Sequence, residues 1–130
     1  HLRSEVFVVE QHCAYLDLDY KDQEAVHLCG KNKKDALVAY CRIFPPGNYF
    51  KECCIGRVVT APAARRRGLG QSLMKEAIAY INRYWPEENI RISGQLYLKG
   101  FYESLGFLQV SDVYMEDDIP HIAMLLIARE

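Results

Sequence analysis

Short apolar runs recur along the chain and are separated by Gly, Pro, Asp and Asn. Runs of this kind are typical of β-strands bounded by turns. The first three follow one another without a helix between them, which predicts an antiparallel meander. The predicted strands are residues 25–30, 36–44, 53–60, 90–93, 107–115 and 121–127.

Two segments have the pattern of an amphipathic helix. In the first, spacings of three or four residues place these apolar side chains on one helical face: Leu69, Leu73, Ala77, Ile78 and Ile81. This helix is expected to end near Tyr84, because Pro86 biases the preceding residue out of the helix and has no N–H. A second helix is predicted over residues 96–105, and Gly106 suits the left-handed position that ends a helix.

The resulting order is β-β-β-α-β-α-β-β after an irregular start, which predicts an α/β (α+β) fold with a mixed sheet. Residues 2–11 fit a helix end that runs into an extended segment, and residues 16–24 resemble an acidic loop. The sequence holds no repeat, low-complexity tract or linker. We therefore expect residues 1–130 to form a single domain.

Charge and cysteine content narrow the classes of function. Sixteen Lys and Arg against seventeen Asp and Glu leave a net charge of -1, which argues against nucleic-acid and membrane partners. No apolar run approaches the ~20 residues that cross a bilayer, and none resembles a secretory signal. The five cysteines are odd in number and form no C-x-x-C pair. We therefore predict neither a disulfide framework nor a metal site, and free thiols indicate the cytoplasm.

The segment from Thr60 to Gly70 predicts an anion site. A strand ends at Thr60 and a helix starts near Gly68, and the first N–H groups of a helix lack internal partners and lie at its positive end. Gly68 and Gly70 let the backbone approach a phosphate. Arg65, Arg66 and Arg67 add charge-assisted hydrogen-bond donors. The site is therefore expected to bind a diphosphate more tightly than a neutral ligand. A solvated arginine face or a small nucleic-acid patch are the alternatives.

The pattern R-x-x-G-x-G, between a strand and an amphipathic helix, resembles the acetyl-CoA loop of the GNAT (GCN5-related) N-acetyltransferases. Further stretches are similar to the ElaA-like branch of that superfamily: Arg3-x-x-Val6-Phe7-Val8-Val9-Glu10-Gln11, Leu37-Val38-Ala39-Tyr40 with Arg42, Ile55-Gly56-Arg57-Val58-Val59, and Asp118-Ile119-Pro120-His121-Ile122-x-Met124. The resemblance implies a GNAT-like, mostly antiparallel sheet flanked by helices. It also implies that the family's first strand and most of its first helix are missing from residues 1–130.

The resemblance further implies acetyl-CoA as cosubstrate. Its pyrophosphate would lie on the loop and its pantetheine against the preceding strand. The implied cofactor-binding residues are Val58, Val59, Thr60, Arg65, Arg66, Arg67, Gly68, Leu69, Gly70, Gln71, Gln95 and Tyr102.

The segment Gln95-x-x-Leu98-x-x-Phe101-Tyr102 resembles the GNAT stretch that carries the general acid. The resemblance implies that Tyr102 protonates the departing CoA thiolate, and that Gln95 takes the place of the usual Asn beside the pantetheine. A phenol has a pKa near 10, so its placement decides whether it can act. The alternative for Tyr102 is a half-buried aromatic residue on an amphipathic helix.

Three residues are candidates for the general base, and water is a fourth alternative. Glu52 precedes a predicted strand, where alternation would turn it to the same side as Cys54, Gly56 and Val58. His121 starts the last predicted strand and titrates near neutrality when unperturbed. Glu10 lies in a block that family members place near the acceptor. Each of the three is equally a surface or structural residue.

These features together predict acetyl transfer from acetyl-CoA to a primary amine, on a small molecule or a protein, by direct transfer in a ternary complex. The alternative is a CoA-binding regulatory or interaction module without turnover. Acidic residues either recognise a cationic acceptor or form solvated loops: Asp17, Asp19, Asp22, Asp117 and Asp118. Both a monomer and a homodimer are compatible with the sequence.

Overall fold

A computed structural model describes residues 1–3, 6, 25–62 and 68–128 of the chain. Its strands are β1 (Val26–Lys31), β2 (Leu37–Phe44), β3 (Cys53–Thr60), β4 (Ile90–Gln95), β5 (Leu108–Gln109), β6 (Tyr114–Glu116) and β7 (Ile119–Leu126). Its helices are α1 (Leu69–Tyr84), the 3-10 turn η4 (Leu96–Leu98) and α2 (Lys99–Ser104). In the described part of the chain, every helix is too short or too polar to span a bilayer.

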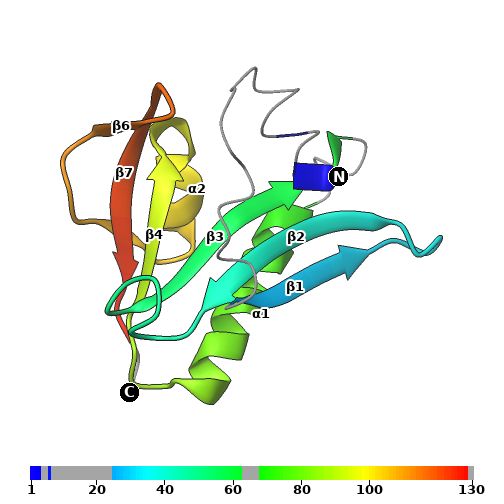
Figure 1. Cartoon of the computed structure of the whole chain (residues 1–130), viewed down its shortest axis with the longest axis horizontal. Coiled ribbons are helices and arrows are strands. Elements are labelled where there is room, and N and C mark those ends of the chain that lie inside the picture. Colours follow the sequence, from blue (N-terminus) through cyan, green and yellow to red (C-terminus); the bar gives the residue numbers. More distant parts are fainter. Residues whose placement is uncertain (4–5, 7–24, 63–67, 129–130) are drawn as a thin grey trace.

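The strands form one mixed sheet, which confirms the predicted fold class (Figure 1). The strand order is β1-β2-β3-β4-β7-β5, and β6 pairs with β7 as a hairpin. The predicted meander is present as β1, β2 and β3, which pair antiparallel. Strands β3 and β4 pair in parallel, because the chain crosses through α1 between them.

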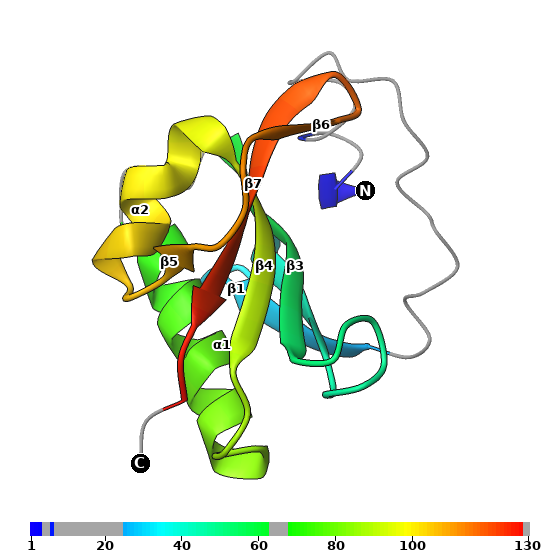
Figure 2. The same ribbon diagram turned by 90° about the vertical axis from the view of Figure 1, so that its left-hand side faces the viewer.

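Helices α1 and α2 lie on the same side of the sheet (Figure 2). Helix α1 buries the apolar stripe that its sequence predicts, with Leu73, Met74, Ala77 and Ile81 against the strands. The main core fills the space between these helices and the sheet. A smaller cluster lies on the opposite face, where Leu2 and Val6 pack against Tyr40 and Val59.

The predicted strand over residues 107–115 is wrong in extent, because this stretch forms only β5 and β6 with an irregular segment between them. Ser111 explains the interruption. Its hydroxyl accepts the N–H of Ala123 at 2.9 Å, so a side chain takes the place of a carbonyl in the β7 ladder. The predicted helix over 96–105 likewise begins as the 3-10 turn η4 before continuing as α2.

Candidate active site

Strands β3 and β4 start together and then separate (Figure 1). Their pairing is confined to Cys53 with Ile90 and Cys54 with Arg91. Beyond that point β3 continues to Thr60 and β4 to Gln95, with no ladder between them among the described residues. We call this opening the wedge. Main-chain N–H and C=O groups along its two sides are available to a ligand that carries amides of its own.

A β-bulge shapes the β3 side of the wedge. Tyr40 of β2 pairs with Val59, whereas Arg42 pairs with Gly56, so β3 has one extra residue in this interval. Arg57 lies in the bulge with φ 51°, in the left-handed region that non-glycine residues rarely adopt.

The bulge overturns the prediction that Glu52, Cys54, Gly56 and Val58 share one face. Val58 packs against the main core instead, on the side of the sheet that the helices cover. Val59 then faces Tyr40 on the other side. The physical reason is that an extra residue resets the two-residue alternation of side chains.

A first cavity, of about 420 Å³, lies at the start of α1 on the helix side of the sheet. We call it the helix-side cavity. Its lining brings together five of the predicted cofactor-binding residues and adds two residues of α2 that the sequence did not point to: Thr60, Gly68, Leu69, Gly70, Gln71, Phe101 and Ser104. Phe101 and Ser104 are three residues apart and therefore share one face of α2.

The geometry at Gly68 exposes the first turn of α1 to this cavity. Gly68 has φ 71° and ψ 14°, which glycine adopts without strain. Its carbonyl accepts the N–H of Ser72 at 3.0 Å. The N–H groups of Leu69, Gly70 and Gln71 precede the first N–H that bonds within the helix, that of Ser72, and no acidic residue in the first turn offsets their positive field.

Tyr102 lies inside the molecule, on the helix side of β4. Its side chain is 7% exposed, and its ring lies against Gly94, where a Cβ atom would come within 3.0 Å of the ring carbon Cε2. Burial raises the pKa of Tyr102 to about 12, with smaller contributions from Tyr97 and Cys41. The phenol is therefore protonated throughout the physiological pH range.

A second cavity, of about 490 Å³, lies on the face of the sheet away from α1 and α2. We call it the sheet-face cavity. Residues from both sides of the wedge line it, including Gly56 and Arg57 on β3 and Ser93 on β4. The remaining lining residues come from strands β2, β3, β4, β6 and β7 and from two connecting segments: Arg42, Phe44, Tyr49, Phe50, Cys54, Arg91, Ile92, Ser111, Tyr114, Glu116 and Ala123.

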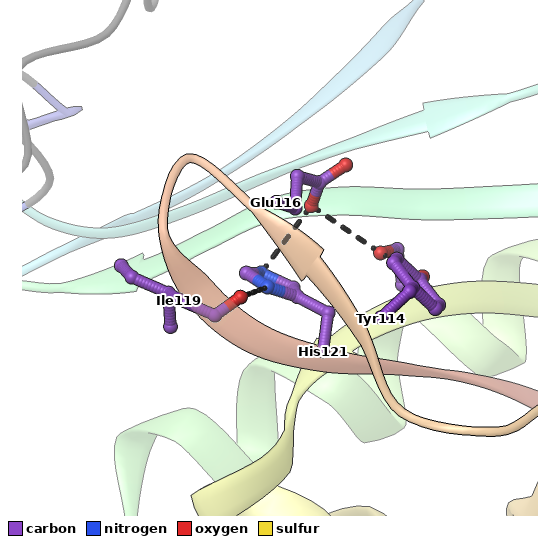
Figure 3. Close-up of polar contacts among 5 residues, drawn as sticks. Tyr114, Glu116, Ile119 and His121 are labelled. Carbon is purple, nitrogen blue, oxygen red and sulfur yellow. Dashed lines mark hydrogen bonds and ion pairs between the residues drawn. The ribbon is translucent and has the colours of Figure 1, made fainter.

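His121 belongs to a polar cluster at one edge of this face (Figure 3). Its side chain is 7% exposed. Nδ1 donates to the carbonyl of Ile119 at 2.7 Å, because a carbonyl can only accept. Nε2 lies 3.3 Å from Oε2 of Glu116, so only this nitrogen is left to exchange a proton. The ring stacks on Tyr114, with 6.2 Å between centroids.

Two hydroxyls complete the cluster. Ser93 Oγ donates to Glu116 at 3.4 Å and lies 2.5 Å from the hydroxyl of Tyr114. Pairing of Gln95 with His121, and of His121 with Tyr114, aligns β4, β7 and β6 at this point. The β6–β7 turn is formed by Asp117 and Asp118, both with positive φ, as a two-residue hairpin requires.

The remaining predicted site residues lie elsewhere. Glu52 is half-buried, precedes β3 and lines neither cavity. Glu10 and Arg65, Arg66 and Arg67 lie outside the described residues. Among the residues that the structure describes, no group of three or more His, Cys, Asp or Glu side chains is arranged to hold a metal ion.

Comparisons with known proteins agree with this architecture. The sequence model of the acetyltransferase (GNAT) domain family matches residues 4–128 of this chain. Protein ElaA of Escherichia coli is 42% identical over 125 residues, which cover 95% of this chain and 81% of ElaA. A crystal structure of an acyl-CoA N-acyltransferase from Pseudomonas aeruginosa superposes with a TM-score of 0.90 at 42% identity, covering 96% of this chain and 85% of that one.

The crystal structure of E. coli ElaA gives a TM-score of 0.88 at 39% identity, over 96% of this chain and 84% of ElaA. These matches span nearly the whole chain. They confirm the resemblance that the sequence motifs indicated. The chain therefore belongs to the GNAT family of N-acetyltransferases, in the branch that contains ElaA.

Proposed function

We propose that the protein transfers an acetyl group from acetyl-CoA to a primary amine, directly and within a ternary complex. The observation that carries this proposal is the arrangement of the wedge and the two cavities. The helix-side cavity suits an anionic donor, and the sheet-face cavity suits an acceptor. The wedge interrupts the sheet between them, where a thioester and an amine can meet from opposite sides.

In this proposal, acetyl-CoA lies along the start of α1 and the β3 side of the wedge. The N–H groups of Leu69, Gly70 and Gln71 bind the pyrophosphate, beside the three arginines that precede Gly68 in the sequence. The main chain of Val58–Thr60 binds the pantetheine amides and holds the carbonyl oxygen, and Gln95 contributes its side-chain amide. The similarity to a protein described as an acyl-CoA N-acyltransferase supports this choice of donor.

Tyr102 acts as the general acid. The amine nitrogen attacks the thioester carbonyl, the C–S bond then breaks, and the departing sulfur takes the phenolic proton as the bond breaks. Tyr102 regains a proton from solvent afterwards. Burial raises the pKa of Tyr102 to about 12, so the phenol holds its proton at neutral pH and is a weaker acid than a free phenol. A thiolate expelled into the same low-dielectric site would be destabilised, which favours its protonation.

His121 is the favoured general base. It lies on the same side of the sheet as the sheet-face cavity, and its Nε2 lies 3.3 Å from Oε2 of Glu116, which lines that cavity. Glu116 would then stabilise the imidazolium that forms. Glu52 is less favoured because it precedes Val58 by six residues, which is about 20 Å along a strand. Glu10 and water remain alternatives.

Substitution of Tyr102 by Phe tests the acid, because it removes the hydroxyl and keeps the ring against Gly94. We expect kcat for thiol release from acetyl-CoA to fall by about 100-fold, while acetyl-CoA still raises the melting temperature. Tyr97→Phe is the matched control, since Tyr97 is 71% exposed. Unchanged turnover in Tyr102→Phe would remove Tyr102 from the mechanism. Stabilisation by acetyl-CoA without thiol release from any amine would favour the non-catalytic CoA-binding module.

Substitution of His121 by Gln tests the base. We expect kcat/KM to fall by about 100-fold at neutral pH and to recover partly as the pH rises, because more of the acceptor amine is then already neutral. Glu52→Gln serves as the control and should retain the wild-type pH profile. The assignment fails if Glu52→Gln loses this activity while His121→Gln keeps it. Thermal unfolding of both variants serves to check that each is folded.

A further inference from the structure

Arginine side chains line part of the sheet-face cavity, and the sequence did not predict this grouping. Among the described residues that line the cavity, three are arginines, Arg42, Arg57 and Arg91, and one is acidic, Glu116. The whole chain has a net charge of -1, so the described lining is more positive than the chain as a whole. Three different strands supply the arginines, namely β2, β3 and β4.

The thiol of Cys54 shows that the three guanidinium groups converge on one region. Cys54 also lines the cavity and is buried at its floor. Burial raises the pKa of Cys54 to about 12, and the charges of Arg42, Arg91 and Arg57 each oppose that increase. The Coulomb energy between two charges falls as the distance between them grows, so a cation that affects the thiol lies near it. All three cations are therefore close to the same point.

Aromatic rings hold two of these guanidinium groups. The Cζ atom of Arg42 lies 5.0 Å from the ring centroid of Phe44, and that of Arg91 lies 5.2 Å from the centroid of Phe50. Stacking on a ring uses the face of a guanidinium and not its N–H edge, and the edge of Arg91 matches the two oxygens of a carboxylate. Within the described residues, no carboxylate lies at ion-pair distance from Arg91.

A negative charge lies farther along β4 in the same cavity. Glu116 lines the cavity and contacts Ser93, which is two residues beyond Arg91 on β4, and His121. A carboxylate and an imidazole attract an ammonium group, and we placed deprotonation of the acceptor at this point. The cavity therefore has a cationic region near Arg91 and a region near Glu116 that suits an amine.

We infer that the acceptor is a small amine that also carries a carboxylate, bound with its carboxylate at Arg91 and its amine toward Glu116 and His121. This inference rests on the proposed function and names the substrate class of the same site. A diamine or polyamine is disfavoured, because its second ammonium would lie among the three arginines. The volume of about 490 Å³ is in the range of small-molecule sites.

A panel of matched amines tests the inference on the wild-type protein. Each linear amino acid has its amine and its carboxylate at opposite ends of a chain of two to six carbons. It is compared with its carboxamide, which has nearly the same shape and no negative charge. Thiol release from acetyl-CoA gives kcat and KM for each. We expect kcat/KM to favour the carboxylate by about tenfold or more at the best chain length, from the usual strength of charge-assisted hydrogen bonds. Equal rates for acid and amide, or a preference for diamines, would overturn the inference.

Variants at Arg91 assign the preference to this region of the cavity. Arg91→Gln should reduce the acid-to-amide ratio about tenfold, mainly through KM, and Arg91→Lys should retain most of it. The matched control is Arg83→Gln, because Arg83 also lies over an aromatic ring, Tyr84, but at the end of α1 outside the cavity. An unchanged acid-to-amide ratio of kcat/KM in Arg91→Gln would overturn the assignment of the carboxylate to Arg91, even if the absolute rates fall.

Binding measurements separate this inference from the proposed function. Calorimetry with propanoate and propanamide, each added to the protein saturated with CoA, needs no turnover. Propanoate is expected to bind more tightly, and Arg91→Gln should remove the difference. If acetyl-CoA neither binds nor supports thiol release with any amine, the proposed function fails. If acetyl-CoA supports transfer but propanoate has no advantage over propanamide, only the substrate class is wrong.

Discussion

Gly94 and Tyr102 together show how one small residue places a large one. The ring of Tyr102 occupies the space above Gly94, and a Cβ atom there would lie 3.0 Å from Cε2 and 3.2 Å from Cδ2. Contacts that short force either the ring or the strand to move. The position of the proposed acid therefore depends on the absence of a side chain at residue 94.

We predict that Gly94→Ala lowers the free energy of unfolding by about 1–3 kcal/mol, the usual cost of overpacking, and slows thiol release because Tyr102 is displaced. Gly100→Ala is the control, since nothing lies within 4 Å of a Cβ atom at Gly100 in α2. That change should stabilise the protein by up to about 1 kcal/mol, because alanine favours a helix over glycine. Urea unfolding and the thiol assay measure both variants. Wild-type stability in Gly94→Ala would contradict the packing argument.

At the scale of the element, the N-terminus of α1 depends on the left-handed conformation of Gly68. The helix has no side-chain cap, so the turn at Gly68 sets where the first free N–H groups point. A residue with a Cβ atom resists this conformation by about 1–2 kcal/mol. The start of the helix would then shift, and with it the part of the helix-side cavity that suits a phosphate.

We expect Gly68→Ala to lose about 1 kcal/mol of stability and to weaken acetyl-CoA binding measurably. Gly47→Ala is a matched control, because Gly47 also has a positive φ, 79°, and also has open space around it. Gly47 lies in the turn between β2 and β3, outside both cavities. Calorimetry should show a loss of affinity only in Gly68→Ala, although both variants lose stability. Equal affinities of Gly68→Ala and Gly47→Ala for acetyl-CoA would show that the turn at Gly68 does not affect binding.

Elements were predicted best where their signal is local. The spacing of apolar residues defined α1 almost to its ends, and β3 was predicted at its true bounds. Residues 107–115 were predicted as one strand, because the apolar run gives no sign that Ser111 bonds to Ala123 on β7. That contact joins positions twelve residues apart and depends on how the two segments pack.

At the scale of the molecule, the core contains thiols and a phenol whose ionisation is suppressed. Burial, followed by the nearby Cys29, raises the pKa of Cys41 to about 12. Burial also raises the pKa values of Cys54 and Tyr102 to about 12. An unfolded chain releases these protons at lower pH than the folded chain does. Protonation of these groups therefore contributes its full stabilisation of the folded state at pH values below about 9 to 10, the pKa values in the unfolded chain. The contribution is lost as the pH rises toward 12, the pKa in the folded chain.

We predict that the free energy of unfolding falls steeply above pH 9, by about 1.4 kcal/mol per pH unit for each such group. Urea unfolding at pH 7.5, 9, 10 and 10.5 measures this slope. Cys41→Ala should reduce the slope, because one titrating group is removed. Ile43→Val should lower the stability without changing the slope, since Ile43 is fully buried and has no titrating group. A stability that is independent of pH up to 10.5 would contradict the burial of these groups.

The sequence alone indicated most of the strand and helix pattern, the turn that precedes α1 and the family, because each depends on residues that are close together in the chain. Periodicity reports which face of an element is apolar, and a motif reports a local backbone geometry. Only the tertiary structure decided the bulge at Arg57, the wedge between β3 and β4 and the gathering of Arg42, Arg57 and Arg91 around one cavity. These features depend on register and on contacts between distant strands, and a one-residue shift in register turns a side chain to the opposite face.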